Sequence, residues 1–379
     1  NSIKNYKNFA LSNLKSDLAP KAWVNAIELE YKMKRPVIAA QSSKKYAQLF
    51  PKENNRIEYL LRSAKVYEGL ALLGKASSIL LDLSNINTIG KKFVTQQEGW
   101  KKLAADYEYL SGDMENAAKI YLQLVSSTNK EIRTLSLVNL EKIYSLRGHG
   151  KLNSKKHTEV IDQIIVQNIQ PESSLLLLKN VEKYYLNNDF PLAFAEAKKV
   201  LKMKGDTSSY AMAKARLIQA KILKQEFIQQ SLKTSLSRLT MVLQLKTGKL
   251  EKAQKAYRST IKYGDAMISI EALSDLSDLY AVYSEQLRSM PYPKDLPENS
   301  QVAFRSEIEN LAMPMEDNSI DTLVNAIKQV KTYNVYGDIA KNLQKKLDRK
   351  NMKAPENPIV QMVSPEVILP IHKEVRHEI

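Results

Sequence analysis

Gly69, Gly74 and Lys75 have the spacing of a phosphate-binding loop, G-x-x-x-x-G-K-[ST]. In such a loop, backbone N–H groups and the lysine bind phosphates, and the Ser or Thr hydroxyl holds Mg²⁺. Here Ala76 occupies the hydroxyl position, and residues 70–73 are apolar. The preceding residues have the apolar spacing of a helix rather than of a strand. We therefore predict no nucleotide site, but one helix that ends at Gly74 and another that starts at Lys75.

Histidine and the motifs of other enzyme classes offer no alternative chemistry. His149 and His157 are eight residues apart, and His372 and His377 are five apart. A helical metal site needs two ligands four residues apart, so neither pair has that geometry. G-x-S-x-G, H-E-x-x-H and G-x-G-x-x-G patterns are missing from the sequence. We therefore predict a non-enzymatic protein without a cofactor or a metal site.

The composition favours a helical protein that can bury a core. The chain has 379 residues, 44% of them hydrophobic, and its 11 glycines and 13 prolines are few for a β-rich protein of this size. It has no cysteine, which excludes disulfides, cysteine–zinc sites and cysteine nucleophiles. No stretch approaches the roughly 18 apolar residues of a membrane span. Because the sequence starts with Asn1 rather than Met, we expect a processed or trimmed chain.

Three segments share a spacing that is typical of a turn between two packed helices. They begin at Gly112, Asn188 and Gly248, and each has an apolar residue two positions later and an alanine five positions later. Glycine and asparagine tolerate the left-handed backbone that ends a helix. The small alanine lets the following helix approach its partner closely. The spacing therefore predicts helix–turn–helix units.

A longer spacing near the start fits the same unit. Trp23, Ala39 and Pro51 are separated by 16 and 12 residues. Together with the three turns, this pattern resembles the tetratricopeptide repeat (TPR) family, whose unit is a helix pair of about 34 residues. The resemblance covers roughly residues 17–285. It implies an all-α fold, a right-handed superhelical solenoid of about 16–20 helices.

The number of residues between successive turns is uneven, and this divides the chain into regions. We predict a TPR-like solenoid over residues 1–285, with an irregular region at 209–247 whose long helices are joined near Gln225–Glu226. A closing helical region should follow at 286–350. Residues 351–379 contain four prolines between short apolar runs, which predicts an extended tail. That tail either covers the last helices or docks on a partner.

A narrower resemblance concerns the last repeats. Arg238, Lys246, Tyr257 and Gly264, followed by the Pro-Tyr-Pro segment 291–293, look like the end of TPR proteins from bacterial cell-envelope machines for gliding, pili or secretion. This resemblance implies a place in the periplasm or cell envelope. A cytoplasmic location is the alternative.

The net charge is +16, but the charged residues are unevenly distributed along the chain. Residues 198–262 carry 13 lysines and 3 arginines against 3 acids, whereas residues 271–321 carry 11 acids against 3 basic residues. Few aromatic side chains and few arginines accompany the lysines, which argues against nucleic acid as the partner. The predicted anionic-partner surface consists of Lys214, Lys221, Lys224, Lys246 and Lys249.

Stacked helix pairs present broad surfaces and a groove, which suit protein binding better than catalysis. We therefore predict a scaffold or adaptor that binds partner proteins, as a subunit of a larger complex. The alternative is a basic-surface binder of an anionic polymer, either nucleic acid or a cell-wall glycan. The two charged blocks also leave open pairing within the chain, and salt-sensitive head-to-tail self-association.

Overall fold

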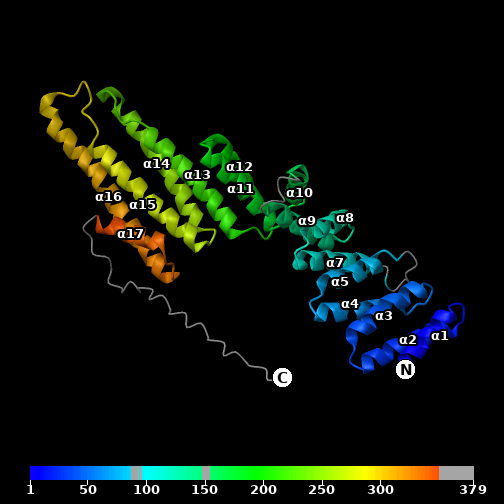
Figure 1. Ribbon diagram of the computed structural model, residues 1–379. Coiled ribbons are helices and arrows are strands. Elements are labelled where there is room, and N and C mark those ends of the chain that lie inside the picture. Colours follow the sequence, from blue (N-terminus) through cyan, green and yellow to red (C-terminus); the bar gives the residue numbers. More distant parts are fainter. Residues whose placement is uncertain (87–92, 94–95, 147–153, 350–379) are drawn as a thin grey trace, which may run out of the picture. The chain divides into compact units, whose positions relative to one another are not determined.

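The computed structural model describes residues 1–86, 93, 96–146 and 154–349 (Figure 1). These residues form α-helices and two short 3₁₀ helices, and none of them lies in a strand. The chain divides into two compact units, residues 1–176 and 177–379. The prediction of an all-α array of helix pairs is confirmed within each unit. The boundaries predicted at 285 and 350 stay predictions, and the predicted tail lies outside the described residues.

Unit 1 is a row of antiparallel helix pairs, in which each helix contacts the next one along the chain (Figure 1). The first helices of its pairs are α2 (Leu18–Lys32), α4 (Arg56–Gly69), α7 (Gln97–Ser111) and α9 (Lys130–Ser145). The second helices are α3 (Pro36–Leu49), α5 (Leu73–Ser84), α8 (Met114–Leu124) and α10 (Ser154–Val166). Helix α1 (Ser2–Ser12) precedes them and packs on α2.

The core of unit 1 uses the residues that suggested the repeat. Trp23, Ala39 and Phe50 are buried in one cluster between α2 and α3. The Trp23 indole N–H donates a hydrogen bond of 2.9 Å to the backbone carbonyl of Ser42, which satisfies its one polar atom. Ala117 and Tyr121 are fully buried in a second cluster, where α8 meets α7 and α9. The small and aromatic positions therefore do pack at the helix crossings.

Unit 2 has both short helices and four that are longer than any described helix of unit 1, and neighbouring helices lie side by side (Figure 1). They are α12 (Phe190–Lys202), α13 (Ser209–Gln229), α14 (Leu239–Ile261), α15 (Ala266–Arg288), α16 (Gln301–Thr332) and α17 (Asp338–Asp348), with α11 (Glu172–Leu186) spanning the division. One apolar cluster joins α13 to α16, and a second joins α15, α16 and α17. The predicted long helices of this region are thus confirmed.

Two of the three predicted turns are confirmed by their backbone. Gly112 and Asn188 have left-handed φ angles of 90° and 60°. In each case the next residue is an aspartate that caps the following helix: the Asp113 carboxylate accepts a 3.0 Å hydrogen bond from the N–H of Asn116. The left-handed residue ends one helix and the aspartate starts the next, so two adjacent residues specify the whole turn.

Three of the positions at which the sequence predicted a break between two helices are wrong. Gly248 lies inside α14, and Gln225 and Glu226 lie inside α13, whose connector to α14 follows at residues 230–238. A glycine costs only about 1 kcal/mol within a helix, and buried Leu250, Ala253 and Tyr257 continue one helical face past it. The turn itself is at Gly264, where φ is 78°.

The third wrong break concerns the glycines that resembled a phosphate-binding loop. Helix α4 ends at Gly69 and α5 starts at Leu73, so Gly74 is helical. The left-handed residue of this turn is Ala71, with φ of 55°. A helix rather than a strand precedes the turn, as the apolar spacing of the preceding residues predicted.

We expect the same substitution to have opposite effects at two glycines. Gly112→Ala should destabilise unit 1 by about 1 kcal/mol, because alanine is strained in the left-handed region. Gly248→Ala should stabilise unit 2 by about 0.5–1 kcal/mol, because it improves helix propensity. An added Cβ meets no atom within 4 Å at either position, so packing does not interfere. Urea unfolding of both variants checks this, and equal signs would contradict it.

Candidate functional site

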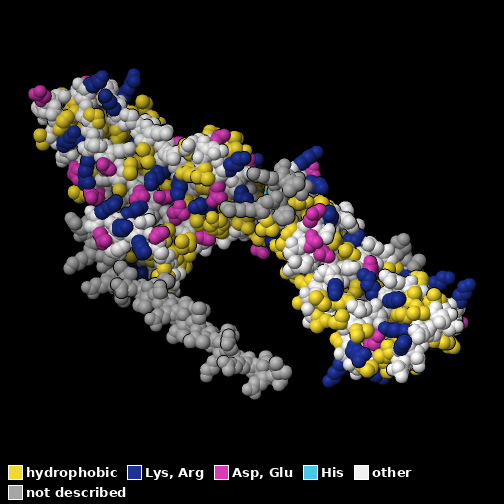
Figure 2. Space-filling model, in the orientation of Figure 1, with side chains coloured by type: hydrophobic (Ala, Val, Ile, Leu, Met, Phe, Trp, Pro, Cys, Tyr) yellow, Lys and Arg dark blue, Asp and Glu magenta, His cyan; other side chains and the backbone are white. Residues whose placement is uncertain are grey.

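Three of the predicted lysines face a row of acids rather than solvent alone. Lys214, Lys221 and Lys224 lie on one side of α13, and Glu271, Asp275 and Asp278 lie on the facing side of α15. The N–O distances are 2.6 Å for Lys221–Glu271, 3.4 Å for Lys214–Glu271, 3.6 Å for Lys221–Asp275, 4.0 Å for Lys224–Asp275 and 3.9 Å for Lys224–Asp278. Figure 2 shows basic and acidic side chains intermingled on this part of the surface.

Helix α17 extends this network with a fourth lysine. The Lys346 ammonium donates hydrogen bonds to both carboxylate oxygens of Asp278, at 2.9 and 2.8 Å, and to the Ser274 hydroxyl at 2.8 Å. The acids of α15 therefore connect α13 on one side with α17 on the other. We call these four lysines and three acids the charge ladder.

The ladder changes the proton affinity of its members. Burial alone would raise the pKa of Glu271, but the hydrogen bond from Lys221 and the charges of Lys221 and Lys214 lower it below its ordinary value. Burial raises the pKa of Asp275 in spite of Lys221 and Lys224. Burial lowers the pKa of Lys221, and its hydrogen bond to Glu271 and the Asp275 charge more than offset this. The ladder thus holds Lys221 and Glu271 as a charged pair.

The two remaining lysines of the prediction act at the end of α13. The Lys246 side chain is fully buried, and its ammonium donates hydrogen bonds of 2.5 Å to the Phe227 carbonyl and 2.8 Å to the Gln230 carbonyl. The Lys249 ammonium lies 3.3 Å from the Glu226 carbonyl. Glu226 and Phe227 belong to the last turn of α13 and Gln230 is its C-cap, where carbonyls run short of intrahelical donors; the Phe227 carbonyl also accepts a 3.2 Å hydrogen bond from the Gln230 N–H. Lys246 and Lys249 therefore cap α13.

The structure thus gives each predicted lysine a contact within the chain, and the intramolecular pairing that the sequence left open is present. Their role in binding a partner stays a prediction, although Lys246 offers no surface to one. Sequence reasoning missed Glu271, Asp275, Asp278 and Lys346 as their partners. The spacing of the three acids, four and three residues apart, was a usable signal for one helical face.

We expect Lys221→Met to destabilise unit 2 by about 1–3 kcal/mol, because it leaves the partly buried Glu271 and Asp275 with weaker partners. The matched control is Lys233→Met, which removes an exposed lysine outside the ladder and should change stability by less than about 0.5 kcal/mol. Urea unfolding measures both. Equal effects would show that the ladder does not stabilise the unit.

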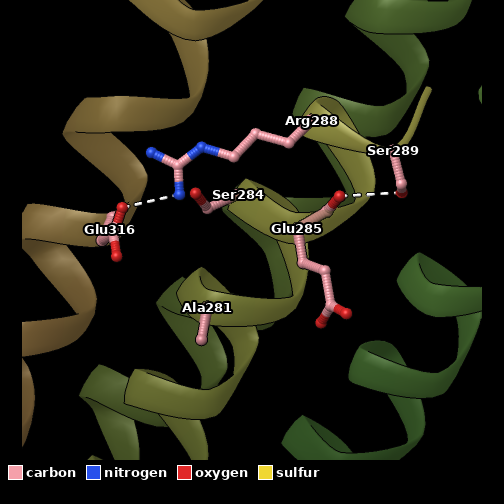
Figure 3. Close-up of a pocket in the computed structure, with 6 residues that line it drawn as sticks. All are labelled: Ala281, Ser284, Glu285, Arg288, Ser289 and Glu316. Atoms are coloured by element: carbon pink, nitrogen blue, oxygen red, sulfur yellow. Dashed lines mark hydrogen bonds and ion pairs between the residues drawn. The ribbon is translucent and has the colours of Figure 1, made fainter. Parts of the chain in front are cut away.

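A groove between α15 and α16 contains a pocket of about 450 Å³. It is lined by Ala281, Ser284, Glu285, Arg288 and Ser289 of α15 and Glu316 of α16 (Figure 3). The Arg288 guanidinium reaches across to α16, 2.6 Å from Glu316 and 2.7 Å from Glu309. The Ser284 hydroxyl is buried and has no hydrogen-bond partner among the described residues. The pocket thus offers carboxylates and one unused hydroxyl.

Unit 1 has an aromatic and charged cluster on its first helices. The Arg62 guanidinium of α4 stacks 3.6 Å from the centre of the Tyr31 ring and lies 2.7 Å from the Glu28 carboxylate, both on α2. The Tyr59 hydroxyl donates a 3.2 Å hydrogen bond to the same carboxylate. Burial and the Glu28 charge raise the pKa of Tyr59 to about 12, so it stays a donor at neutral pH. About 40% of the Glu28 and Arg62 side chains is exposed, which leaves this cluster accessible.

The other surfaces of unit 1 add one hollow. Helices α1 and α2 line an open hollow of about 680 Å³, with Tyr6, Phe9 and Leu18 among its apolar residues and Asn5 and Lys21 among its polar ones. No group of metal-binding side chains and no helix that could cross a membrane occurs in the described ranges. His157 lies 4.0 Å from Glu141 and beside the Tyr144 ring, while the other three histidines fall outside those ranges.

Comparisons with known proteins add little to this geometry. No family model matches the sequence, and no curated protein matches it. Among solved structures, the chain is similar to a "circular tandem repeat protein with novel repeat topology and enhanced subunit contact surfaces". The identity is 14% and the TM-score 0.25, with 92% of this chain and 90% of that chain covered. A likeness at that TM-score carries no argument, so the assignment of the fold depends on the helices themselves.

Proposed function

We propose that this protein is a TPR-type scaffold that binds partner proteins through the first-helix face of unit 1. The observation that carries the proposal is the cluster of Tyr31, Tyr59 and Arg62 with Glu28, which is partly exposed across α2 and α4. Tyrosine and arginine are enriched at the energetic centres of protein interfaces. The pre-stacked guanidinium loses little side-chain freedom when a partner covers it.

The proposal includes a complex of the bacterial cell envelope, in the periplasm or at its boundary. The support for this location is the resemblance of the last repeats to TPR proteins of envelope machines. Binding of an anionic polymer is a weaker second candidate. It would depend on Lys214, Lys221, Lys224, Lys246 and Lys249, whose ammonium groups are already engaged within unit 2.

Two charge swaps form a matched test of the binding face. Exchanging Glu28 and Arg62 (Glu28→Arg with Arg62→Glu) inverts the charge pattern of the first helices but keeps an ion pair. Exchanging Lys44 and Asp82 does the same on the second helices α3 and α5, where that pair lies 3.3 Å apart. Surface pairs of this kind contribute about 0–1 kcal/mol, so both variants should fold.

The measurement is affinity purification of each variant from native cells, followed by quantitative mass spectrometry. We expect the first-helix swap to lose a defined set of partner proteins that wild type and the second-helix swap retain. Equal recovery with both swaps would reject this face as the binding surface. Salt-sensitive recovery of RNA or glycan in place of proteins would favour the second candidate.

A further inference from the structure

The outer face of α14 combines exposed apolar side chains with cations. Arg238, directly before the helix, is followed at steps of three, four and seven residues by Met241, Leu245, Lys252 and Lys255, so the five side chains lie along one side. Met241 is 54% exposed and Leu245 51%, and all three cations are exposed. Figure 2 shows basic and hydrophobic side chains beside one another at the end of unit 2 where α14 begins (upper left).

The cations of this face are free, in contrast to those of the charge ladder. Arg238, Lys252 and Lys255 form no ion pair with any described residue, whereas Lys221 is paired with acids of α15. Helix α14 contains five basic residues and a single acid, Glu251. Positive charge on the outer face is therefore not neutralised by the described part of the chain.

The core of unit 2 holds this face in place. Leu250 and Tyr257, on the opposite side of α14, are buried, and the Lys246 ammonium joins the helix to the end of α13. The connector before α14 is fixed as well, because the Leu236 N–H donates a 2.6 Å hydrogen bond to the Asp295 carboxylate. A ligand thus meets a helix that is already folded, and binding avoids the conformational entropy that folding of an unstructured segment would cost.

The apolar side chains narrow the choice of ligand. Cations alone would suit any polyanion, but RNA and glycans offer no hydrocarbon to Met241 and Leu245. The surface of an anionic bilayer offers both, because lipid phosphates attract Lys and Arg while the acyl chains begin within about 10 Å of the headgroups. Lysine also reaches outward to headgroups while its stem lies against apolar surface. The face therefore has the chemistry of a helix that lies on a membrane.

We propose that the outer face of α14 binds the surface of an anionic lipid bilayer. The helix lies in the plane of the headgroups, and Met241 and Leu245 enter the boundary of the acyl chains. Arg238, Lys252 and Lys255 contact the lipid phosphates on either side of them. This inference goes beyond the proposed binding of partner proteins, because it uses a surface of unit 2 and another class of ligand.

The experiment is sedimentation of the full chain with vesicles of phosphatidylcholine, either alone or mixed with the anionic phosphatidylglycerol. We expect wild type to bind the anionic vesicles at least about tenfold more tightly than the neutral ones. Two double variants, Met241→Ser with Leu245→Ser and Lys252→Gln with Lys255→Gln, should each weaken binding to anionic vesicles by about tenfold. The first loses apolar area that the bilayer would bury, and the second loses two phosphate contacts.

Matched controls remove the same kinds of side chain from unit 1. Leu110→Ser with Val166→Ser changes two apolar residues that are 67% and 84% exposed, more than Met241 and Leu245 are. Lys65→Gln with Lys130→Gln changes two exposed lysines that form no ion pair with a described residue. Both controls should bind anionic vesicles as wild type does. Circular dichroism confirms that every variant is folded.

A fluorescent label reports whether apolar side chains enter the bilayer. The chain has no cysteine, so a single introduced cysteine can carry a nitrobenzoxadiazole label. We expect Leu245→Cys, once labelled, to give brighter and blue-shifted emission with anionic vesicles, because the label leaves water for the acyl region. Labelled Leu110→Cys should show no change.

Several outcomes would overturn this inference. Failure to bind anionic vesicles, or equal binding to neutral ones, is the first, and equal binding by a double variant and its control is the second. The third is weaker binding in the lysine variant without a change in emission at residue 245, because the face would then bind polyanions such as RNA or acidic proteins by charge alone. The vesicles contain no protein, so the result is independent of the charge-swap test in unit 1.

Discussion

Lys246→Glu should unfold unit 2, with a loss of about 4 kcal/mol or more. The side chain at this position is fully buried, and its ammonium caps the Phe227 and Gln230 carbonyls while lying 4.1 Å from the centre of the Phe227 ring. A glutamate there would place a buried negative charge against two carbonyl oxygens at the negative end of a helix. Urea unfolding followed by circular dichroism measures the loss.

Two further variants separate charge from packing at this site. Lys246→Met keeps the length of the side chain but removes the ammonium donor from both carbonyls, of which Phe227 retains the Gln230 N–H, and this should cost about 1–3 kcal/mol. Lys249→Glu reverses a nearby charge at the surface, and we expect a change within about 0.5 kcal/mol. If Lys246→Glu were as stable as Lys249→Glu, the cap would have no importance for folding.

The same lysine makes stability depend on pH in the alkaline range. Burial, and then the charge of Lys249, lower the pKa of Lys246 to about 8. Between pH 8 and the unfolded value near 10.5, the unfolded chain binds more protons than the folded one, so stability rises with pH. We expect wild type to gain up to about 3 kcal/mol over this range relative to Lys246→Met. Parallel pH profiles of the two proteins would contradict the shift.

Tyr257→Ala should cost about 3–5 kcal/mol, because it removes a fully buried ring from the main core of unit 2. Tyr257→Phe isolates the hydroxyl, which has no hydrogen-bond partner among the described residues. Burial, and then the Asp275 charge, raise the pKa of Tyr257, so the hydroxyl stays protonated.

The phenylalanine variant should therefore be as stable as wild type, or up to about 1 kcal/mol more stable, since an unpaired polar group leaves the core. Thermal and urea unfolding of the pair measure both effects. A loss of about 1 kcal/mol or more in Tyr257→Phe would mean that the hydroxyl is bonded in solution.

The turns show which structural features a local sequence pattern can predict and which it cannot. Gly112 and Asn188 were predicted as turns from the apolar residue two positions later and the alanine five positions later, and the structure adds a capping aspartate directly after each. Gly248 has the same apolar and alanine spacing but is followed by Lys249 rather than an aspartate, and the packing of Leu250, Ala253 and Tyr257 continues the helix through it. Tertiary burial outweighs the propensity of one residue, so a turn motif inside a strong apolar stripe misleads.

The lysines show that contacts between side chains on a surface are equally hard to predict from local sequence. Their excess over acids in one block was visible in the sequence, and so was the acidic block that follows. Which lysine meets which acid depends on the parallel course of α13 and α15, and the burial of Lys246 depends on where α13 ends. Neither fact is local, because the partners are 16–57 residues apart in the chain.

The sequence by itself determined that this chain is helical, where two of its hairpins turn and which small and aromatic residues pack at their crossings, since each follows from spacings within one or two helices. The tertiary structure alone decided that the lysines form a ladder and a cap, that Tyr31 and Arg62 stack on unit 1, and that α17 packs against α15 and α16. Those features need side chains from different helices to meet, and the distance between helices is set by packing.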